Sequence, residues 1–269
     1  MDAALTELIG KCATRPPELP DGEIHLWRAD LDRDMSALPA LATVLAPEEL
    51  AKAGRFRFVR DRIRYIVAHG TLRAILAWYM NARSRDLTFR YGPQGKPELA
   101  GDALRFSMSH SHDLVLVAIS RVAAVGVDVE LVRPGVDQDV ARCFMTRARQ
   151  PLDELPRAPG RRAFFQAWTR MEAYLKARGE GLNFGLKPLE ALLEPCNAAA
   201  CPALGDSGQH SRWWLRDFSP RRGYVGAVAV RSGECRLGYR NWAPHGTGRR
   251  RRLEPRRVER GIGISSAPS

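Results

Sequence analysis

The sequence predicts an α+β fold of two similar lobes, and three observations lead to this prediction. Strand-like and helix-like stretches alternate along most of the 269 residues. Each half of the chain supplies one long helical stretch and about three or four strand-like runs. Hydrophobic residues make up 45% of the chain, which is enough to build sizeable cores. We therefore expect an N-terminal lobe over residues 1–122 and a C-terminal lobe over residues 123–245.

In the N-terminal half, periodicity and end signals predict a strand, two helices and two further strands. The run EIHLWRADL (23–31) alternates like a strand. Pro47 and the two acidic residues after it open a helix, because proline suits a first helical turn and acids favour its positive end. A long helix is expected over 57–81, where one stripe contains Val59, Ile63, Ile66, Gly70 and Ala77. The remaining elements are a loop and two strands, at 91–99, 104–110 and 114–120.

In the C-terminal half, the same signals predict a second long helix and four strands. The helix covers about 161–178 and stops near Gly179, where a C-cap glycine belongs. Strands are expected at 124–132, 212–218, 224–230 and 236–242. Residues 194–210 are expected to form a surface loop.

Part of the formal net charge of +12 is concentrated at the end of the chain. Residues 246–269 hold seven arginines and two glutamates, so +5 comes from this segment. Because it lacks apolar periodicity, we expect a disordered tail that is dispensable for folding and chemistry. A basic protein attracts nucleic acid, membrane headgroups, nucleotide phosphates or an acidic protein, and charge alone does not choose among them.

The rest of the composition disfavours several classes of protein. No run of about 18 apolar residues is present, so no membrane span is expected. The N-terminus lacks the basic-then-apolar order of a secretory signal. The five cysteines are scattered and have no partner at metal-ligand spacing. This pattern favours reduced thiols in a cytoplasmic protein over a zinc site or a disulfide framework.

Three short segments carry candidate chemistry, and the first is GVDVE (126–130). Asp128 and Glu130 are two residues apart on an expected strand, so both carboxylates project from the same face. Like charges side by side raise each other's pKa unless a cation joins them, and Mg²⁺ favours carboxylate and phosphate oxygens. A solvent-facing strand edge explains the same two residues equally well.

The second segment, SMSHSH (107–112), places serines and two histidines, including Ser109 and His110, at the end of a strand. It lacks the G-x-S-x-G elbow of a serine hydrolase, and no third ligand is found at zinc spacing. Polar side chains at a strand terminus suit contact with phosphates, and a simple polar turn is the alternative. Lys96, in GKP (95–97), lies in a rigid turn that has no P-loop frame.

The third segment, WTRMEAYLK (168–176), places Glu172 and Lys176 four residues apart on one helix face. Taken alone, this spacing favours a solvated ion pair, which is common on surface helices. The other two segments have to be considered with it before a catalytic role is assigned.

In this order the segments resemble a known family, the 4′-phosphopantetheinyl transferases, and within it the larger, surfactin-synthetase-type branch. The resemblance runs from about residue 24 to residue 230 and also takes in HLWRADL, RFRFVRDRIRYIVAHGTLR and YGPQGKPEL. It implies a monomer of two lobes related by a pseudo-twofold axis, with coenzyme A in the cleft between them. The implied reaction moves the phosphopantetheine arm of coenzyme A to a serine of an apo carrier protein and releases adenosine 3′,5′-bisphosphate.

The resemblance also implies roles for individual residues. Asp128, Glu130 and Glu172 match the family's metal-binding acids, and Mg²⁺ is the expected ion. Glu172 would also take the proton of the carrier serine, and Lys176 would stabilise charge on the departing bisphosphate. The residues that match positions holding coenzyme A are Arg64, Lys96, Ser109, His110 and Lys176.

One position departs from the family pattern, because Met171 stands where the family usually has a lysine. Helical spacing puts Met171 on an apolar stripe, with Glu172 and Lys176 flanking that stripe. We therefore expect Met171 to face packing, to weaken an accessory charge contact and to leave the metal site intact.

Two other classes of function stay open on the sequence. A nucleic-acid-binding protein would explain the charge, although no recognised binding motif is present. A catalytically impaired relative that binds carrier proteins would keep the fold, although the intact acids and Lys176 argue against it. The implied partner is an acidic helical carrier protein of fatty-acid, polyketide or nonribosomal-peptide synthesis.

Overall fold

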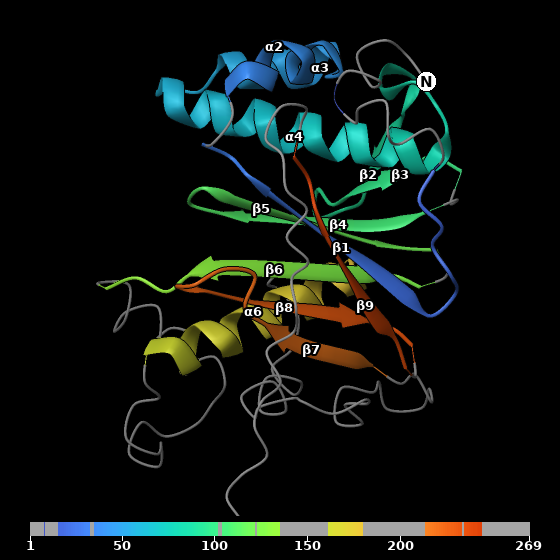
Figure 1. Cartoon of the computed structure of the whole chain (residues 1–269), viewed down its shortest axis with the longest axis vertical. Helices are drawn as coiled ribbons and strands as arrows, with labels where there is room; N and C mark the ends of the chain where they lie inside the picture. The colour runs from blue at the N-terminus through green and yellow to red at the C-terminus, as the bar shows by residue number, and fades with distance from the viewer. Residues whose placement is uncertain are drawn as a thin grey trace, which may run out of the picture.

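The computed structural model describes residues 8, 16–32, 35–101, 104–121, 123–134, 161–179, 213–232 and 234–243. Within these residues the strands form two main sheets and one short hairpin (Figure 1). The first sheet has the order β4 (Arg105–Ser111), β5 (Leu114–Ser120), β1 (Glu23–Asp30), β9 (Arg236–Asn241). The second has the order β6 (Val125–Leu131), β8 (Tyr224–Val230), β7 (Trp214–Phe218). The hairpin joins β2 (Phe89–Tyr91) to β3 (Pro97–Leu99).

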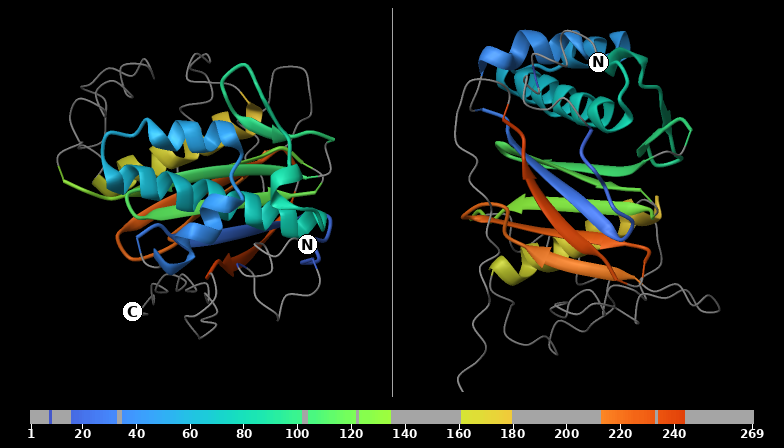
Figure 2. Two further views of the ribbon diagram at one scale, coloured as in Figure 1. Left: turned by 90° about the horizontal axis from the view of Figure 1, so that it is seen from above. Right: turned by 45° about the vertical axis from the view of Figure 1, so that its right-hand side comes forward.

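The helices cover the outer faces of the two stacked sheets (Figures 1 and 2). The long helix α4 (Val59–Met80) lies over the first sheet, and α2 (Leu38–Thr43) and α3 (Pro47–Gly54) pack against α4. Helix α6 (Arg161–Arg178) lies over the second sheet. Two short 3-10 turns, η1 (Met35–Ala37) and η2 (Ser84–Asp86), flank this N-terminal helical layer. None of the described helices has an apolar stretch long enough to cross a lipid bilayer.

Buried side chains fill the three spaces between these four layers. In β5, Val115 and Val117 belong to the cluster beneath α4, whereas Leu114 and Leu116 face the second sheet. Strand β8 is divided in the same way between the first sheet and α6. Because both faces of these strands are covered, their sequences are apolar throughout instead of alternating with polar residues.

The predicted α+β class is confirmed, and the predicted strands and long helices are present with ends that differ by one or two residues. The expected loop at 91–99 is partly wrong, because Tyr91 and residues 97–99 belong to the paired strands of a hairpin. The short helix α2 was not predicted. The expected loop at 194–210 and the tail at 246–269 lie outside the described residues.

Strand β9 crosses from the C-terminal half of the chain into the first sheet. It pairs in parallel with β1, and Glu23 lies opposite Arg236. The two sheets therefore do not coincide with the two halves of the chain. The lobes over 1–122 and 123–245 and their pseudo-twofold relation stay predictions.

Gly126 allows α6 to lie directly against β6. A β-carbon at this position would come within 1.9 Å of the carbonyl oxygen of Ala173 and 2.5 Å of the amide nitrogen of Ala177. Both atoms are helix backbone, which cannot rotate away as a flexible side chain can. The absence of a side chain at Gly126 thus sets the distance between β6 and α6, which carry Asp128 and Glu172 respectively.

We expect Gly126→Ala to destabilise the protein by about 3 kcal/mol or more, beyond the ~1–3 kcal/mol typical of overpacking, because backbone must shift. Activity at low temperature should fall as well, because α6 is displaced. Gly54→Ala is the control, since a β-carbon there meets no atom within 4 Å. Urea unfolding of both variants tests this, and equal stabilities would contradict the close approach.

Candidate active site

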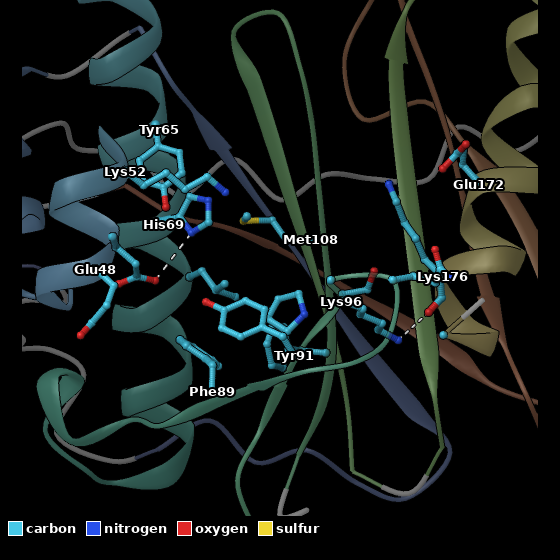
Figure 3. Close-up of a pocket in the computed structure, with 18 of the residues that line it drawn as sticks. Glu48, Lys52, Tyr65, His69, Phe89, Tyr91, Lys96, Met108, Glu172 and Lys176 are labelled. Atoms are coloured by element: carbon cyan, nitrogen blue, oxygen red, sulfur yellow. Dashed lines mark hydrogen bonds and ion pairs between the residues drawn. The ribbon is translucent and has the colours of Figure 1, made fainter. Parts of the chain in front are cut away.

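A cavity of about 560 Å³ opens between the helical layer of the first sheet and α6. One wall comes from α3 and α4, and Figure 3 shows Lys52, Tyr65 and His69 on it. Glu172 and Lys176 lie on the opposite wall, on α6. The β2–β3 hairpin contributes aromatic and glycine-flanked residues, and β4 contributes the floor around Met108. The cavity therefore has an apolar, aromatic side and a charged side.

The charged side is built where β4 runs beside β6. The two strands belong to different sheets, and serine side chains of β4 take the place of backbone pairing. The amide of Val127 donates to Ser107 Oγ (3.2 Å), and the amide of Leu131 donates to Ser111 Oγ (3.1 Å). In each pair the two residues are twenty positions apart in the sequence. Because this separation stays constant along β4 and β6, the two strands run parallel. The alternating serines of the SMSHSH segment therefore join the two sheets.

The same serines hold the two carboxylates of β6. Ser109 Oγ donates to Asp128 Oδ1 at 2.6 Å, and Ser111 Oγ donates to Glu130 Oε2 at 2.7 Å. Ser111 was not a predicted site residue. Its position two residues after Ser109 on the same strand is the signal that could have found it.

Asp128 is the most buried acid of the site, with 4% of its surface exposed. Lys176 Nζ lies 2.6 Å from Asp128 Oδ1 and 3.2 Å from Ser109 Oγ. Asp128 Oδ2 is buried and has no hydrogen-bond partner in the described structure. Lys176 therefore pairs with Asp128 across the two elements, instead of forming the solvated ion pair with Glu172 that the helical spacing alone favours.

Burial and mutual repulsion raise the pKa of the two other carboxylates. Desolvation is the largest cause for Glu130, and the neighbouring charge of Asp128 acts in the same direction. For Glu172, desolvation is again the largest cause, and Asp128 and Glu130 add to it while Lys176 opposes it. Three acids and one lysine therefore interact electrostatically in one partly desolvated region.

The donor chemistry of these acids suits a hard divalent cation. Within the described residues, no three His, Cys, Asp or Glu side chains are gathered closely enough to hold an ion in the present conformation. Carboxylate oxygens are nevertheless the ligands that Mg²⁺ prefers. The buried Asp128 Oδ2 without a partner is the kind of atom that an ion would satisfy. The residues fit Mg²⁺ by chemistry, provided that Glu130 and Glu172 rotate toward Asp128.

Lys96 connects the hairpin to both β6 and α6. Its Nζ donates to the carbonyl of Val125 (3.2 Å) and to the carbonyl of Lys176 (2.5 Å). The second contact places a positive charge at the C-terminal end of α6, where helix carbonyls lack partners. Burial lowers the pKa of Lys96 to about 8, and the positive charges of Arg105 and Lys176 contribute to this.

His110 and Arg64 were predicted to hold coenzyme A, and the structure gives them different surroundings. Desolvation lowers the pKa of His110, with His69 and Lys176 acting in the same direction. The side chain of His110 is nevertheless exposed, and His110 is not among the residues that line the cavity. Arg64 does not line the cavity, because it forms two hydrogen bonds with Asp32, at 2.7 Å and 2.5 Å.

The aromatic side of the cavity was missed in the sequence. Tyr65 and His69 stack with ring centroids 4.0 Å apart, and Lys52 Nζ lies 5.5 Å from the centre of the Tyr65 ring. His69 Nδ1 is 3.7 Å from Glu49 Oε1, and Glu49 is buried. The spacing of four between Tyr65 and His69 puts both on one helix face, which is the available sequence signal.

Met171 faces packing, as its helical position predicted. It is 5% exposed and belongs to the cluster between α6 and the second sheet, together with Phe164 and Leu175. A lysine at this position would have to bury its stem among these side chains. That methionine at this position leaves Glu172 and Lys176 in place stays a prediction.

Comparison with known proteins gives the same outline as the motifs. Residues 124–229 match the 4′-phosphopantetheinyl transferase superfamily, and residues 31–122 match the N-terminal part of a 4′-phosphopantetheinyl transferase. The 4′-phosphopantetheinyl transferase HetI of Nostoc sp. is 37% identical over 227 residues, which cover 80% of this chain and 92% of HetI. The chain belongs to the 4′-phosphopantetheinyl transferase superfamily. The resemblance read from the sequence motifs is thereby confirmed.

Two further relatives show how widely this transferase sequence is spread. A protein of Synechocystis sp. is 32% identical over 196 residues, covering 71% of this transferase and 78% of the relative. The 4′-phosphopantetheinyl transferase psf-1 of Bacillus pumilus is 32% identical over 172 residues, covering 63% and 73%. The two family matches together span α3, α4 and α6, which contribute to both walls of the cavity.

Proposed function

We propose that the cavity binds coenzyme A and that the acids and Lys176 transfer its phosphopantetheine arm to a serine of a carrier protein. The superfamily supplies the reaction, since its members are phosphopantetheinyl transferases. The observation that supports the location is the buried Asp128, which is held by Ser109 and Lys176. Lys176 lines a cavity large enough for a nucleotide-containing ligand.

We assign an Mg²⁺ ion to Asp128, Glu130 and Glu172. When bound, the ion would neutralise the diphosphate of coenzyme A, which otherwise repels a nucleophile. Ser109 holds one oxygen of Asp128, which orients this carboxylate before an ion arrives, and Ser111 holds one oxygen of Glu130. In this conformation Lys176 balances the charge of Asp128.

Glu172 is assigned as the base that takes the proton of the carrier serine. The serine oxygen forms a bond to the phosphorus next to pantetheine, and the bond from that phosphorus to the bisphosphate oxygen breaks. The serine proton goes to the Glu172 carboxylate, directly or through a water, and the electron pair of the broken bond leaves with adenosine 3′,5′-bisphosphate. Partial burial raises the pKa of Glu172, which makes it a better proton acceptor than an exposed carboxylate.

Cationic and polar groups are assigned to the phosphates of coenzyme A. Lys176 and Lys96 both line the cavity, and His110, outside that lining, is assigned a supporting role because Lys176 influences its pKa. Ser109 already uses its proton on Asp128, so its main role in this arrangement is to orient that acid. Arg64 would have to release Asp32 before it could bind a phosphate.

The pH dependence of coenzyme A binding tests the role of Lys96. Its pKa of about 8 means that the free amine is mostly charged at pH 7 and mostly neutral at pH 9. Phosphate favours the charged form and raises the pKa on binding, so binding at pH 9 requires proton uptake. We therefore expect affinity to fall by roughly tenfold from pH 7 to pH 9.

Lys96→Arg is the matched control for this titration, because an arginine stays charged over the whole range. Calorimetry in buffers of different ionisation enthalpy should detect proton uptake by the wild type and not by Lys96→Arg. An identical pH dependence in both proteins would remove Lys96 from the phosphate site.

The transferase reaction itself is tested by mass spectrometry of the carrier. An apo carrier incubated with the protein, coenzyme A and Mg²⁺ should gain the mass of phosphopantetheine. A carrier that binds but keeps its mass would indicate a catalytically impaired carrier-binding homologue. A carrier that neither binds nor gains mass would favour the other alternative, a nucleic-acid-binding homologue. We further propose that the enzyme acts as a cytoplasmic monomer on an acidic carrier and binds no specific nucleic acid.

A further inference from the structure

One arginine between β7 and β8 connects the second sheet to two elements of the first. Arg221 donates a hydrogen bond to Asp30 Oδ1 at 2.7 Å and another to Asp113 Oδ1. Asp30 is the last residue of β1, and Asp113 lies in the turn that joins β4 to β5. The hydroxyl of Tyr224, at the start of β8, donates to the same oxygen of Asp113. We call Asp113, Arg221 and Tyr224 the turn clamp.

The turn that the clamp holds has an unfavourable local conformation. It consists of His112 and Asp113, and the residues on either side of it, Ser111 and Leu114, pair with each other. His112 has a φ of 54°, and a residue other than glycine adopts this left-handed region at a cost in free energy. Such a conformation persists where tertiary contacts fix the chain around it. The carbonyl of Asp113 accepts from the amide of Leu31 at 2.8 Å, and its carboxylate adds the contacts of the clamp.

This turn follows directly after the serine that contacts Glu130. Ser111 Oγ donates to Glu130 Oε2 and accepts from the amide of Leu131. One hydroxyl therefore contacts both the side chain of Glu130 and the backbone that follows it. In the second sheet, Tyr224 lies opposite Leu131, and Val225 lies opposite Glu130. The clamp thus joins β4 to the second sheet at the residue pair next to Glu130.

The clamp is held by charge as well as by hydrogen bonds. Burial acts to raise the pKa of Asp113, but the hydrogen bonds from Tyr224 and Arg221 outweigh burial and hold this pKa below its usual range. The guanidinium of Arg221 also lies 4.8 Å from the centre of the Tyr224 ring. Hydrogen bonds to an ionised carboxylate are stronger than those between neutral groups, so the clamp restrains the turn firmly.

We infer that Asp113, Arg221 and Tyr224 are positioning residues for Glu130. They hold the β4–β5 turn against the second sheet, and the turn holds Ser111 beside Glu130. Glu130 then has fewer conformations to lose when it turns toward an ion, so the ion binds more tightly. This inference rests on the proposed function, because it takes Glu130 as a ligand of Mg²⁺.

The test compares the Mg²⁺ affinity of Asp113→Asn, Ser111→Ala and the double variant. Asp113→Asn keeps the shape of the side chain, and Arg221 keeps Asp30 as a partner, so the fold should survive. Calorimetric titration of the coenzyme A-bound protein with Mg²⁺ should show a roughly tenfold weaker Kd in each single variant, as expected for groups that support metal ligands. By contrast, kcat at saturating Mg²⁺ should change little. The double variant should bind no more weakly than Ser111→Ala, because Asp113 acts through Ser111.

Asp32→Asn is the matched control, and Tyr224→Phe is a second clamp variant. Arg64 lowers the pKa of Asp32 and the charge of Asp113 opposes this, so the two acids lie close together. Asp32 accepts its described hydrogen bonds from Arg64, which is not part of the clamp. Asp32→Asn should therefore leave the Kd for Mg²⁺ unchanged. Tyr224→Phe keeps the buried ring and removes one donor to Asp113, so it should weaken the Kd by a smaller factor than Asp113→Asn.

The outcomes separate this inference from the proposed function. If the wild type loads the carrier while Asp113→Asn and Tyr224→Phe keep its Kd for Mg²⁺, the inference is wrong and the proposed function stands. Fully additive losses in the double variant would overturn it too, because the clamp would not act through Ser111. An equal loss in Asp32→Asn would show a general effect of charge, and a fall in kcat that follows thermal stability would show a merely structural role. If the wild type neither binds Mg²⁺ nor loads any carrier, the proposed function fails and the inference fails with it.

Discussion

Asp128→Ala is expected to abolish transfer to the carrier at any ordinary Mg²⁺ concentration. Asp128 lies at the centre of the charged side, where it accepts hydrogen bonds from Ser109 and Lys176 and keeps one buried oxygen without a partner. Among the three acids assigned to the ion, Asp128 is the one that is almost fully buried, and alanine removes its carboxylate. Without the ion, the diphosphate would keep its full charge and repel the carrier serine.

The fold should survive this substitution. Lys176 loses its partner, but its side chain is 30% exposed and can turn toward solvent. Glu48→Ala is a matched control, because Glu48 also lines the cavity but lies on the opposite wall. Circular dichroism checks folding, and calorimetric titration with Mg²⁺ gives a readout that does not depend on activity. Full activity of Asp128→Ala, or full activity of the wild type in EDTA, would remove the metal from the mechanism.

Glu172→Gln is expected to lower kcat by the ~10²–10⁴-fold that general acid–base catalysis contributes. Glutamine keeps the shape of the side chain and removes both the proton-accepting group and the negative charge. Burial, and after it repulsion from Asp128 and Glu130, raises the pKa of Glu172. Glutamine should relieve both penalties and leave the protein at least as stable. A large loss of turnover without a loss of stability is therefore the signature of a catalytic role.

Met171→Lys is the companion variant for this helix. Position 171 packs against the second sheet, so a lysine there should cost stability and change turnover only modestly. Steady-state transfer by both variants, with thermal unfolding of each, compares the two positions directly. If Met171→Lys raises activity by orders of magnitude while Glu172→Gln does little, the roles on α6 are assigned to the wrong residues.

The element order and the chemical segments could be predicted from the sequence because both are local properties. The strand at 114–120 and the helix at 161–178 are marked by composition and end signals that act within a few residues. The burial of Met171 followed from helical spacing alone. Asp128 and Glu130 were correctly placed on one strand, which is enough to put both carboxylates on one face.

Tertiary structure decided which of these local features meet. Lys176 was expected beside Glu172, four residues away, yet its ammonium binds Asp128, which is 48 residues away in the sequence. Lys96 reaches the carbonyl of Lys176 across 80 residues, and Ser111 holds Glu130 because β4 lies beside β6. The pairing of β9 with β1 likewise joins the two ends of the described chain.

The physical reason is that periodicity reports which face of an element is buried but not what buries it. The sequence by itself determined that an acid pair, a serine-rich strand end and an acid–base helix exist in this order. The three segments form one site only because α6 packs directly against Gly126. No local signal in the sequence of β6 specifies this packing.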